Sequence, residues 1–409
     1  MPMILADVMD YREAARRRIP RFLFDYVDGG AFAETTLRDN IDRLHRVRLR
    51  QRVLTGADHV SLSGALLGRE TAMPLALGPV GMAGLNARRG EVQAARAAEA
   101  AGVPFCLSTV GACSIEEVRK GVQTPPWFQL YVTRDRGFMR DMIARARDAG
   151  ADTLFLTVDM PAPGPRYRDK RSGLSGGTAM QRQLGRIAQV MTRPAWAVDV
   201  GLLGGPHTIG HVSSALGSGA GIDDYWAWMS KNFDASVTWD DAEEIRRLWS
   251  GRMVIKGILD PADAMEAAAR GFDGVVVSNH GGRQLDGTLA SIDALGPIAR
   301  AVGDRMTVLM DGGIRSGLDV LRAMASGADG VLLGRAWVYG LAARGQRGVE
   351  EVLSLIAAEM RVAMTLVGVS RLDEIGPELL VSSLEQEALA GHLTDPALPH
   401  YEMMQQRMR

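Results

Sequence analysis

Short apolar runs rich in valine, isoleucine, leucine and methionine recur along the chain, and alanine-rich segments with helical spacing separate most of them. Runs this short are typical of strands buried on both faces of a parallel sheet. The predicted strands are residues 73–78, 103–108, 127–132, 153–158, 253–257, 274–278, 306–311 and 330–334. The predicted helices include residues 91–101, 115–120, 138–149, 261–270, 292–302, 318–325 and 349–365.

This alternation of strand and helix predicts an α/β fold, specifically a (β/α)8 barrel of the TIM type. Several predicted helices are followed directly by glycine, as at Gly102, Gly150 and Gly271, which suits the left-handed cap position. An open doubly wound sheet is the alternative. It requires a break in the strand order that a sequence does not reveal.

The spacing of the elements predicts how the chain is organised. A barrel of ~250 residues with insertions suits the 409 residues of the chain, so we expect one domain over residues 1–409. The interval between residues 158 and 253 is the longest one, which places a long insertion after the fourth strand, on the end that carries active-site loops. The expected segments are an N-terminal helical lead-in at 1–70, the barrel at 71–345, the insertion at 160–250, and a C-terminal helix and tail at 346–409.

Composition and charge narrow the class of protein. Hydrophobic residues make up 46% of the chain and charged residues 23%, as in ordinary globular proteins, and the net charge of −1 gives no indication of a nucleic acid partner. Two cysteines are too few for a disulfide framework, and Cys106 lies in an apolar run where a buried thiol is expected. The first residues lack the order of a signal peptide, and no run approaches the ~20 apolar residues of a transmembrane helix. We therefore expect a cytoplasmic protein.

Residues 278–287 carry the clearest chemical signal, because they follow a predicted buried strand and place His280 and Arg283 on either side of two glycines. Histidine exchanges a proton near physiological pH, and arginine grips a carboxylate through two parallel hydrogen bonds. Glycine lets a ligand approach the backbone closely. This pattern predicts a base and an anion clamp at the mouth of a strand.

Further polar residues and glycines follow the other predicted strands, at the barrel end where enzymes of this fold place their chemistry. Lys256 is the most informative of them. A buried lysine is costly unless it is paired, so we interpret Lys256 as functional rather than as part of a structural salt bridge. The other candidates at the first seven strand ends are Pro79, Val80, Gly81, Ser108, Gln129, Tyr131, Thr157, Asp159, Ser278 and Asp311.

Two glycine-rich turns follow the last two strands. Gly312-Gly313-Ile314-Arg315 and Gly334-Arg335 each join glycine to arginine, and barrel phosphate sites are usually built at this position. Two ordinary turns are the alternative. No G-x-G-x-x-G motif opens a first strand-helix-strand unit, so a Rossmann nicotinamide site is not supported, and no set of metal ligands is predicted.

Six motifs in this chain match a known family. They are Phe24-Asp25-Tyr26, Pro79-Val80-Gly81, residues 127–131, Thr157-Val158-Asp159, residues 278–287, and Leu333-Gly334-Arg335. On these motifs the chain resembles, from about residue 11 to about residue 377, the FMN-dependent L-2-hydroxy acid dehydrogenases and oxidases. Within that family it is most similar to the bacterial respiratory L-lactate dehydrogenases.

The resemblance implies catalytic roles. His280 would be the base, and Asp159 would orient it and stabilise the imidazolium ion. Lys256 would stabilise the negative charge of the reduced flavin ring. Tyr131 would contribute a hydroxyl to catalysis and to substrate binding.

The resemblance also implies binding roles. Arg166 and Arg283 would bind the substrate carboxylate, with Tyr26, Tyr131 and His280 completing the substrate site. The flavin ring and ribityl chain would contact Pro79, Val80, Gly81, Ser108, Gln129, Thr157, Lys256 and Ser278. The end of the site that holds the phosphate would be formed by Asp311, Gly312, Gly313, Arg315, Gly334 and Arg335.

The implied reaction is the two-electron oxidation of an L-2-hydroxy acid with reduction of FMN, and L-lactate to pyruvate is our choice. Small residues at Gly81 and Val110 suggest a pocket with room for more than glycolate, so a mandelate-type acid is the alternative. The proton leaves either from the hydroxyl, with hydride transfer, or from C2, giving a carbanion. The electrons would pass to a quinone or a similar acceptor, with oxygen as the alternative.

Rival proteins share part of this pattern. Type 2 isopentenyl diphosphate isomerase and inosine monophosphate dehydrogenase resemble the chain in their phosphate turns. Neither explains His280 and Arg283 together with Asp159 and Tyr26. An inactive flavin-binding protein should have lost one of these four residues, and all four are present.

The insertion bears on the acceptor. Between residues 170 and 198 it holds basic residues, no acidic ones, and several large apolar side chains. Such a segment can lie on an anionic membrane, so we expect possible peripheral contact with the inner face of the cell membrane through residues 170–215. A lid or an oligomer contact is the alternative. Arg168, Lys170 and Arg171 are interpreted as a solvated run, and the resemblance suggests a homotetramer.

Overall fold

A closed barrel of parallel strands forms the centre of the computed structural model, which describes residues 3–205, 210–216 and 222–382. The eight-stranded sheet has the order β3-β10-β9-β8-β7-β6-β5-β4, and a parallel bridge between Leu77 and Phe105 joins its two edges. The (β/α)8 barrel is therefore confirmed, and the open doubly wound sheet is wrong. The strands are β3 (Leu75–Leu77), β4 (Cys106–Ser108), β5 (Trp127–Tyr131), β6 (Thr153–Thr157), β7 (Arg252–Ile258), β8 (Gly274–Val277), β9 (Thr307–Met310) and β10 (Gly330–Leu333).

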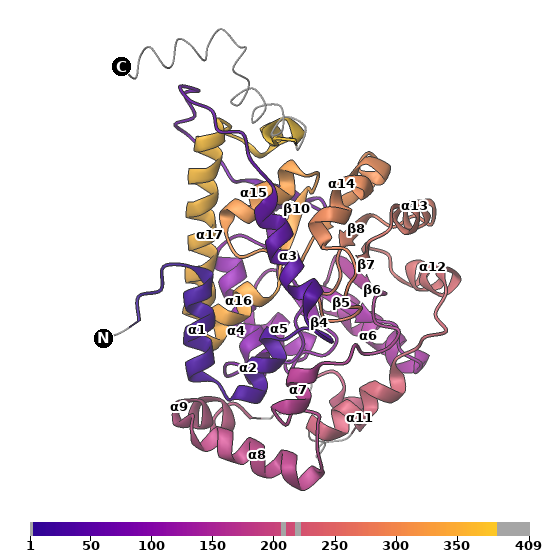
Figure 1. Ribbon diagram of the computed structural model, residues 1–409. Helices are drawn as coiled ribbons and strands as arrows, with labels where there is room; N and C mark the ends of the chain where they lie inside the picture. The colour runs from indigo at the N-terminus through magenta and orange to yellow at the C-terminus, as the bar shows by residue number, and fades with distance from the viewer. Residues whose placement is uncertain (1–2, 206–209, 217–221, 383–409) are drawn as a thin grey trace.

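A helix follows each barrel strand and covers the outside of the sheet (Figure 1). These helices are α4 (Gly90–Ala100), α5 (Ile115–Gly121), α6 (Arg136–Asp148), α12 (Trp239–Leu248), α13 (Pro261–Ala269), α14 (Ser291–Val302), α15 (Gly317–Ala325) and α16 (Arg335–Arg344). Helix α16 was not among the helical patterns read from the sequence. Residues 336–342 are all buried, so this helix has no polar face and shows no amphipathic period.

The N-terminal residues contain helices and a hairpin. The helices are α1 (Val8–Arg18), α2 (Arg21–Asp28) and α3 (Thr35–Arg46), and the antiparallel hairpin is β1 (Gly64–Leu66) with β2 (Arg69–Thr71). The helical lead-in predicted from the sequence did not include this hairpin. Its turn places Leu66 and Leu67 in the apolar cluster inside the barrel, where they lie against the first residues of β8 and β10.

The core has two layers. The larger cluster fills the space between the sheet and the surrounding helices. The smaller one lies inside the barrel and takes one side chain from every strand: Ala76, Cys106, Trp127, Phe155, Val254, Val276, Leu309 and Leu332. Cys106 and Cys113 are free and buried, as expected for Cys106. The barrel is thus a packed core, and a ligand can bind only at an end.

The long insertion lies between β6 and β7, at the carboxyl end of the strands, as predicted. It contains α7 (Tyr167–Arg171), α8 (Ala179–Met191), α9 (Pro194–Trp196), a π-helical turn η2 (Ala197–Leu202), α10 (Ser213–Leu216) and α11 (Ile222–Asn232), ahead of α12. In Figure 1, α8 and α9 lie at the edge of the molecule, away from the strands.

Short elements complete the chain. They are η1 (Ala83–Leu85), the long helix α17 (Gln346–Val367), η3 (Leu372–Glu374) and η4 (Pro377–Leu379). The predicted tail lies, beyond residue 382, outside the described residues. Among the helices of the described ranges, none combines the length and the apolar character needed to cross a bilayer.

The packing inside the barrel allows a prediction about the stability of the protein. Phe155 is fully buried there, and truncating a buried phenylalanine leaves a cavity that costs about 3–5 kcal/mol. We expect Phe155→Ala to lower the free energy of unfolding by that amount in urea titrations followed by circular dichroism. The matched control Leu184→Ala removes an exposed side chain and should change it by less than about 0.5 kcal/mol. Equal unfolding midpoints for the two variants would contradict the packed interior.

Candidate active site

A layer of polar side chains caps the apolar interior of the barrel. Because side chains alternate between the two faces of a strand, the residue two positions after each interior residue also points inward. Adding two to the number of each residue in the interior apolar layer therefore gives a second layer, which lies above the first. Its members are Gly78, Ser108, Gln129, Thr157, Lys256, Ser278, Asp311 and Gly334. Seven of the eight were predicted as site residues from the sequence, and the barrel brings them together.

Lys256 lies at the centre of this layer. Its Nζ atom donates to Ser278 Oγ over 2.9 Å and lies 2.9 Å from Asp311 Oδ2. Burial acts to lower the pKa of Lys256, but the charges of Asp311 and Asp159 outweigh burial and raise it. The side chain is therefore an ammonium ion at neutral pH. The structural salt bridge is present, and both of its residues border the pocket described below.

A bulge in β7 sets the position of Asp159. The pairing of β7 with β8 shifts between Lys256 and Ile258, and Gly257 between them has a φ of +109°. A Cβ atom on Gly257 would lie 2.5 Å from Asp159 Cβ. Only glycine therefore allows both the bulge and the close approach of the carboxylate.

His280 and Asp159 form the candidate acid-base pair. His280 Nδ1 lies 2.9 Å from Asp159 Oδ1, and the residue has a left-handed backbone with a φ of +58°. Burial lowers the pKa of His280, against the opposing effect of Asp159. Burial alone would raise the pKa of Asp159, yet the interactions with His280 and Lys256 lower it. The carboxylate can only accept, so Nδ1 carries the hydrogen and Nε2 of the neutral ring is left as an acceptor.

Two arginines and two tyrosines surround the same space. The guanidinium of Arg283 lies 4.9 Å from the centre of the Tyr26 ring, and that of Arg166 lies 5.8 Å from it. Burial and the neighbouring Arg166 lower the pKa of Arg283. Burial and the charge of Asp159 raise the pKa of Tyr131, so its phenol stays protonated. Two cations beside neutral hydroxyls form a site for a carboxylate.

The glycine-rich turns form the other end of the site. Gly312 and Gly313 have φ values of +97° and +86°, and Arg315 donates through Nη1 to the carbonyl oxygen of Ile314. Arg335 donates to the carbonyl oxygens of Val27, Gly29 and Gly281 over 2.8–2.9 Å, so part of its donor capacity is already used. Burial and the nearby Arg283 lower the pKa of Arg335 to about 9.

One pocket joins these groups. It encloses about 1100 Å³ of space between atoms, part of it open to solvent, and both His280 and the glycine-rich turns border it. Most predicted site residues border it, but Ser108, Gln129, Thr157, Ser278 and Asp159 are not among the residues that line it. Ser108 Oγ donates to Gln129 Oε1 over 2.8 Å.

Helix α11 of the insertion supplies a wall that sequence reasoning missed. Tyr225, Trp226 and Met229 border the pocket, with Phe233 just beyond the helix, and the rings of Trp226 and Tyr26 meet edge to face at 6.2 Å. The sequence feature that could have indicated this wall is the helical spacing of the four positions, which places them on one face of a helix.

Comparisons with known proteins agree with this chemistry. The sequence model described as FMN-dependent dehydrogenase matches residues 15–382. This chain belongs to the FMN-dependent dehydrogenase family. It is 58% identical to a protein named L-lactate dehydrogenase from Caulobacter sp. (strain K31), over 93% of this chain and 100% of that protein. A protein of the same name from Pseudomonas syringae pv. syringae (strain B728a) is 56% identical, over 93% of this chain and 100% of that protein.

Solved structures extend the comparison. The structure described as that of the monotopic membrane protein (S)-mandelate dehydrogenase is similar with a TM-score of 0.86 and 35% identity, over 92% of this chain and 99% of that one. A mandelate oxidase structure is similar with a TM-score of 0.76 and 38% identity, over 90% of this chain and 96% of that one. The predicted family, fold and cofactor are thereby confirmed.

The residues present fit FMN. Among the described residues, Arg315 borders the pocket, and its Nε is a buried donor without a hydrogen-bond partner. Buried donors are rarely left unpaired, so its pairing is expected to come from a ligand. A phosphate supplies an acceptor of this kind, and the ammonium of Lys256 suits a flavin ring that gains negative charge.

The His280–Asp159 pair allows a prediction about how the activity depends on pH. His280 must be neutral to accept a proton, and the Asp159 charge favours its protonated form. Removing that charge in Asp159→Asn should lower the pKa of His280 further. We therefore expect the acid limb of the kcat/KM profile to move to lower pH, while kcat falls by about 10²-fold because the base is no longer oriented. The exposed Asp58→Asn is the control. An unchanged acid limb in Asp159→Asn would exclude this pairing.

Proposed function

We propose that this chain oxidises L-lactate to pyruvate, with His280 as the base. The observation that carries the proposal is one pocket bordered by Arg166, Arg283 and His280, whose Nδ1 is paired with Asp159. An imidazole beside a carboxylate accepts a proton, and two arginines bind the carboxylate of a 2-hydroxy acid. The relatives named L-lactate dehydrogenase, at 56–59% identity, support lactate as the substrate.

Each residue then has a defined task. Arg166 and Arg283 hold the substrate carboxylate, and Tyr26 and Tyr131 contact its polar groups. His280 Nε2 accepts the proton that the substrate loses, and Asp159 stabilises the resulting cation. FMN, when bound, accepts the two electrons.

Lys256 and the polar layer would hold the flavin. Lys256 would face the part of the ring that becomes negative on reduction. We assign Pro79, Val80, Gly81, Ser108, Gln129, Thr157 and Ser278 to the ring and ribityl chain. For the phosphate end we assign Asp311, Gly312, Gly313, Arg315, Gly334 and Arg335, with donors of Arg335 that the carbonyl oxygens leave unused.

The size of the substrate is limited by neighbours of Gly81 rather than by Gly81 itself. A Cβ atom on Gly81 would lie 2.7 Å from Val110 Cγ2 and 3.0 Å from Tyr26 Oη. A side chain at position 81 would therefore meet Val110 and Tyr26, and mandelate stays the alternative substrate that the bleaching test compares with lactate.

The function is tested by anaerobic bleaching of the yellow enzyme. We expect L-lactate to bleach it faster than mandelate or glycolate. His280→Gln should slow flavin reduction by about 10³-fold or more while FMN stays bound, because the acceptor of the proton is lost. The exposed His59→Gln serves as the matched control. If the flavin of His280→Gln were reduced at the normal rate, the assignment of His280 as the base would be refuted. If mandelate bleached the enzyme faster than L-lactate, mandelate would replace lactate as the proposed substrate.

We further propose that α8 and η2 touch a membrane, where a quinone would take the electrons. Met180, Leu184, Ile187 and Met191 form an exposed stripe on α8, with Leu184 61% and Met191 77% exposed. A stripe of large apolar side chains needs a cover in water. The structure described as a monotopic membrane protein supports this reading by its similarity.

Three arginines of the insertion play a different part from the one expected. Arg186 donates to the carbonyl oxygens of Gly173 and Leu174 and pairs with Asp223 at 2.7 Å, and Arg182 also reaches Asp223. Arg193, just after α8, donates to the carbonyl oxygen of Ile19 in the N-terminal segment. Because these arginines bind other parts of the protein, the proposal assigns the membrane contact to the apolar stripe. The homotetramer and the cytoplasmic location stay predictions.

Vesicle binding tests the contact. We expect the wild type to sediment with anionic vesicles and Leu184→Glu/Ile187→Glu to bind at least about tenfold more weakly, because each buried leucine or isoleucine contributes about 1.5–3 kcal/mol. Lactate oxidation with a soluble dye should be unchanged. The control Leu285→Glu alters an equally exposed leucine on a barrel loop and should sediment like the wild type. Equal recovery of all three proteins in the supernatant would end the membrane proposal.

A further inference from the structure

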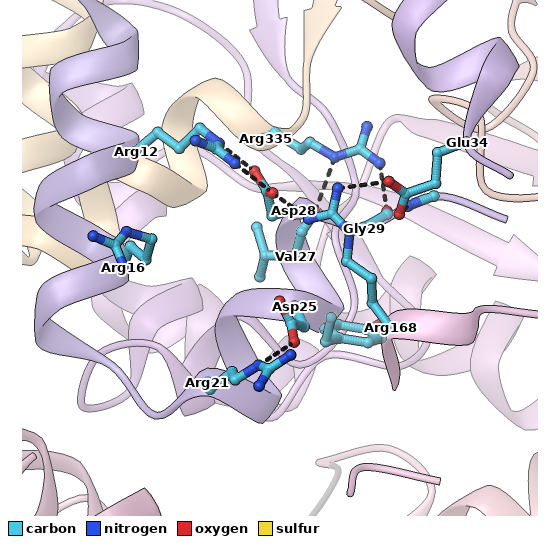
Figure 2. Close-up of polar contacts among 12 residues, drawn as sticks. Arg12, Arg16, Arg21, Asp25, Val27, Asp28, Gly29, Glu34, Arg168 and Arg335 are labelled. Carbon is cyan, nitrogen blue, oxygen red and sulfur yellow. Dashed lines mark hydrogen bonds and ion pairs between the residues drawn. The ribbon is translucent and has the colours of Figure 1, made fainter. Parts of the chain in front are cut away.

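Arg168, on α7 of the insertion, bridges two acidic residues of the N-terminal segment (Figure 2). Its Nη1 lies 2.6 Å from Asp28 Oδ2, and its Nη2 lies 2.6 Å from Glu34 Oε2. The interpretation of Arg168 as part of a solvated run is therefore wrong. Lys170 and Arg171 beside it are exposed, as expected.

Asp28 is the most heavily engaged carboxylate of this cluster. It also accepts bonds from Arg12, over 2.5 and 2.7 Å, and from Tyr339 Oη over 2.7 Å. Burial alone would raise the pKa of Asp28, but the bonds from Arg12, Tyr339 and Arg168 hold it well below its usual range. Asp28 therefore stays charged at any working pH. It connects α2 to α1, α7 and α16.

The backbone beside Asp28 holds two arginines of the active site. Arg283 Nη1 donates to the carbonyl oxygens of Tyr26 and Gly29 over 2.6 and 2.9 Å. Arg335 donates to those of Val27 and Gly29. These oxygens lie at the end of α2, where helical carbonyl groups lack partners within the helix. A shift of this turn would move both guanidinium groups.

Glu34 grips the other side of the same turn. Its Oε1 accepts the backbone N–H of Gly30 over 2.9 Å, while Oε2 receives Arg168. Arg168 thus clamps the turn from both sides, through the side chain of Asp28 and through Glu34.

Arg168 is also two residues from Arg166. Arg166 precedes the short helix α7 and lies 3.7 Å from the buried Asp169, so the position of α7 decides where Arg166 points. Arg168 consequently connects the backbone that carries Arg166 to the turn whose carbonyl oxygens hold the guanidinium of Arg283.

We propose that Arg168 is a positioning residue for the substrate carboxylate. It fixes the distance between Arg166 and Arg283 by holding α7 against the end of α2. The proposal rests on the proposed function for the roles of Arg166 and Arg283. Because these arginines bind the substrate before and during the reaction alike, losing their alignment should weaken binding more than it slows the chemistry.

The test compares Arg168→Gln with Lys170→Gln, which removes an exposed cation two residues away. We expect Arg168→Gln to raise KM for L-lactate by about 10- to 100-fold, with kcat within about threefold, since a displacement of about 1 Å can cost that much. Lys170→Gln should match the wild type. An unchanged KM in Arg168→Gln, with normal FMN content, would overturn the proposal, as would an equal loss in kcat and kcat/KM.

Oxalate binding separates this proposal from the proposed function. Oxalate carries a carboxylate for the arginine pair and has no C2 hydrogen to lose, so its Kd can be read from the flavin spectrum without turnover. Arg168→Gln should weaken oxalate binding by about the same factor as it raises KM. That result would support the proposal even if L-lactate proved not to be the substrate. Equal Kd values in the wild type and the variant would refute it.

A double-mutant cycle tests whether Arg168 acts through Arg166. In the Arg166→Lys background, adding Arg168→Gln should weaken oxalate binding by clearly less than it does in the wild type. Fully additive effects would show that Arg168 acts elsewhere and would contradict the proposal. If Arg168→Gln does not fold, Glu34→Gln provides a second test, because it weakens only one of the two ion pairs of Arg168. Glu34→Gln should raise the Kd for oxalate by a smaller factor than Arg168→Gln would. An unchanged Kd for oxalate would count against the proposal.

Discussion

The closure of the eight-stranded sheet is the constraint on which the rest of the structure depends. In a closed barrel, inward-pointing side chains of neighbouring strands share layers, so a step of two residues along any strand moves up one layer. The apolar layer from Ala76 to Leu332 fills the barrel, and the layer above it holds Lys256, Asp311 and their polar neighbours. A site made of segments far apart in the sequence is therefore one continuous floor.

The buried cations of the site find hydrogen-bond partners of two different kinds. Lys256 is paired with the carboxylate of Asp311 inside the floor. Arg283 and Arg335 instead donate to neutral carbonyl oxygens at the end of α2. A carbonyl oxygen orients a guanidinium without cancelling its charge, so the positive field remains for an anionic ligand. Several buried cations can therefore share one pocket and leave a positive potential there, which the proposed carboxylate and phosphate sites require.

The insertion supplies what the barrel cannot. Arg166 and the aromatic side chains of α11 come from it, and Arg186 on α8 binds carbonyl oxygens of the insertion and Asp223 rather than solvent. The side of α8 that remains exposed is apolar. The segment therefore borders the pocket on one side and presents an apolar surface on the other, as the proposed membrane contact requires.

The sequence by itself determined the barrel, because each strand is buried on both faces and reads as an apolar run between glycines. It also singled out His280, Arg283, Lys256 and Asp159 as candidates, since their types stand out at strand ends, and the barrel brings the four to one end. Tertiary structure alone decided the contacts of Arg168 and the existence of α16. A charged run looks solvated until its distant partners Asp28 and Glu34 are known, and a helix buried on all sides carries no period. Both features depend on contacts between residues far apart in the chain, which local patterns do not encode.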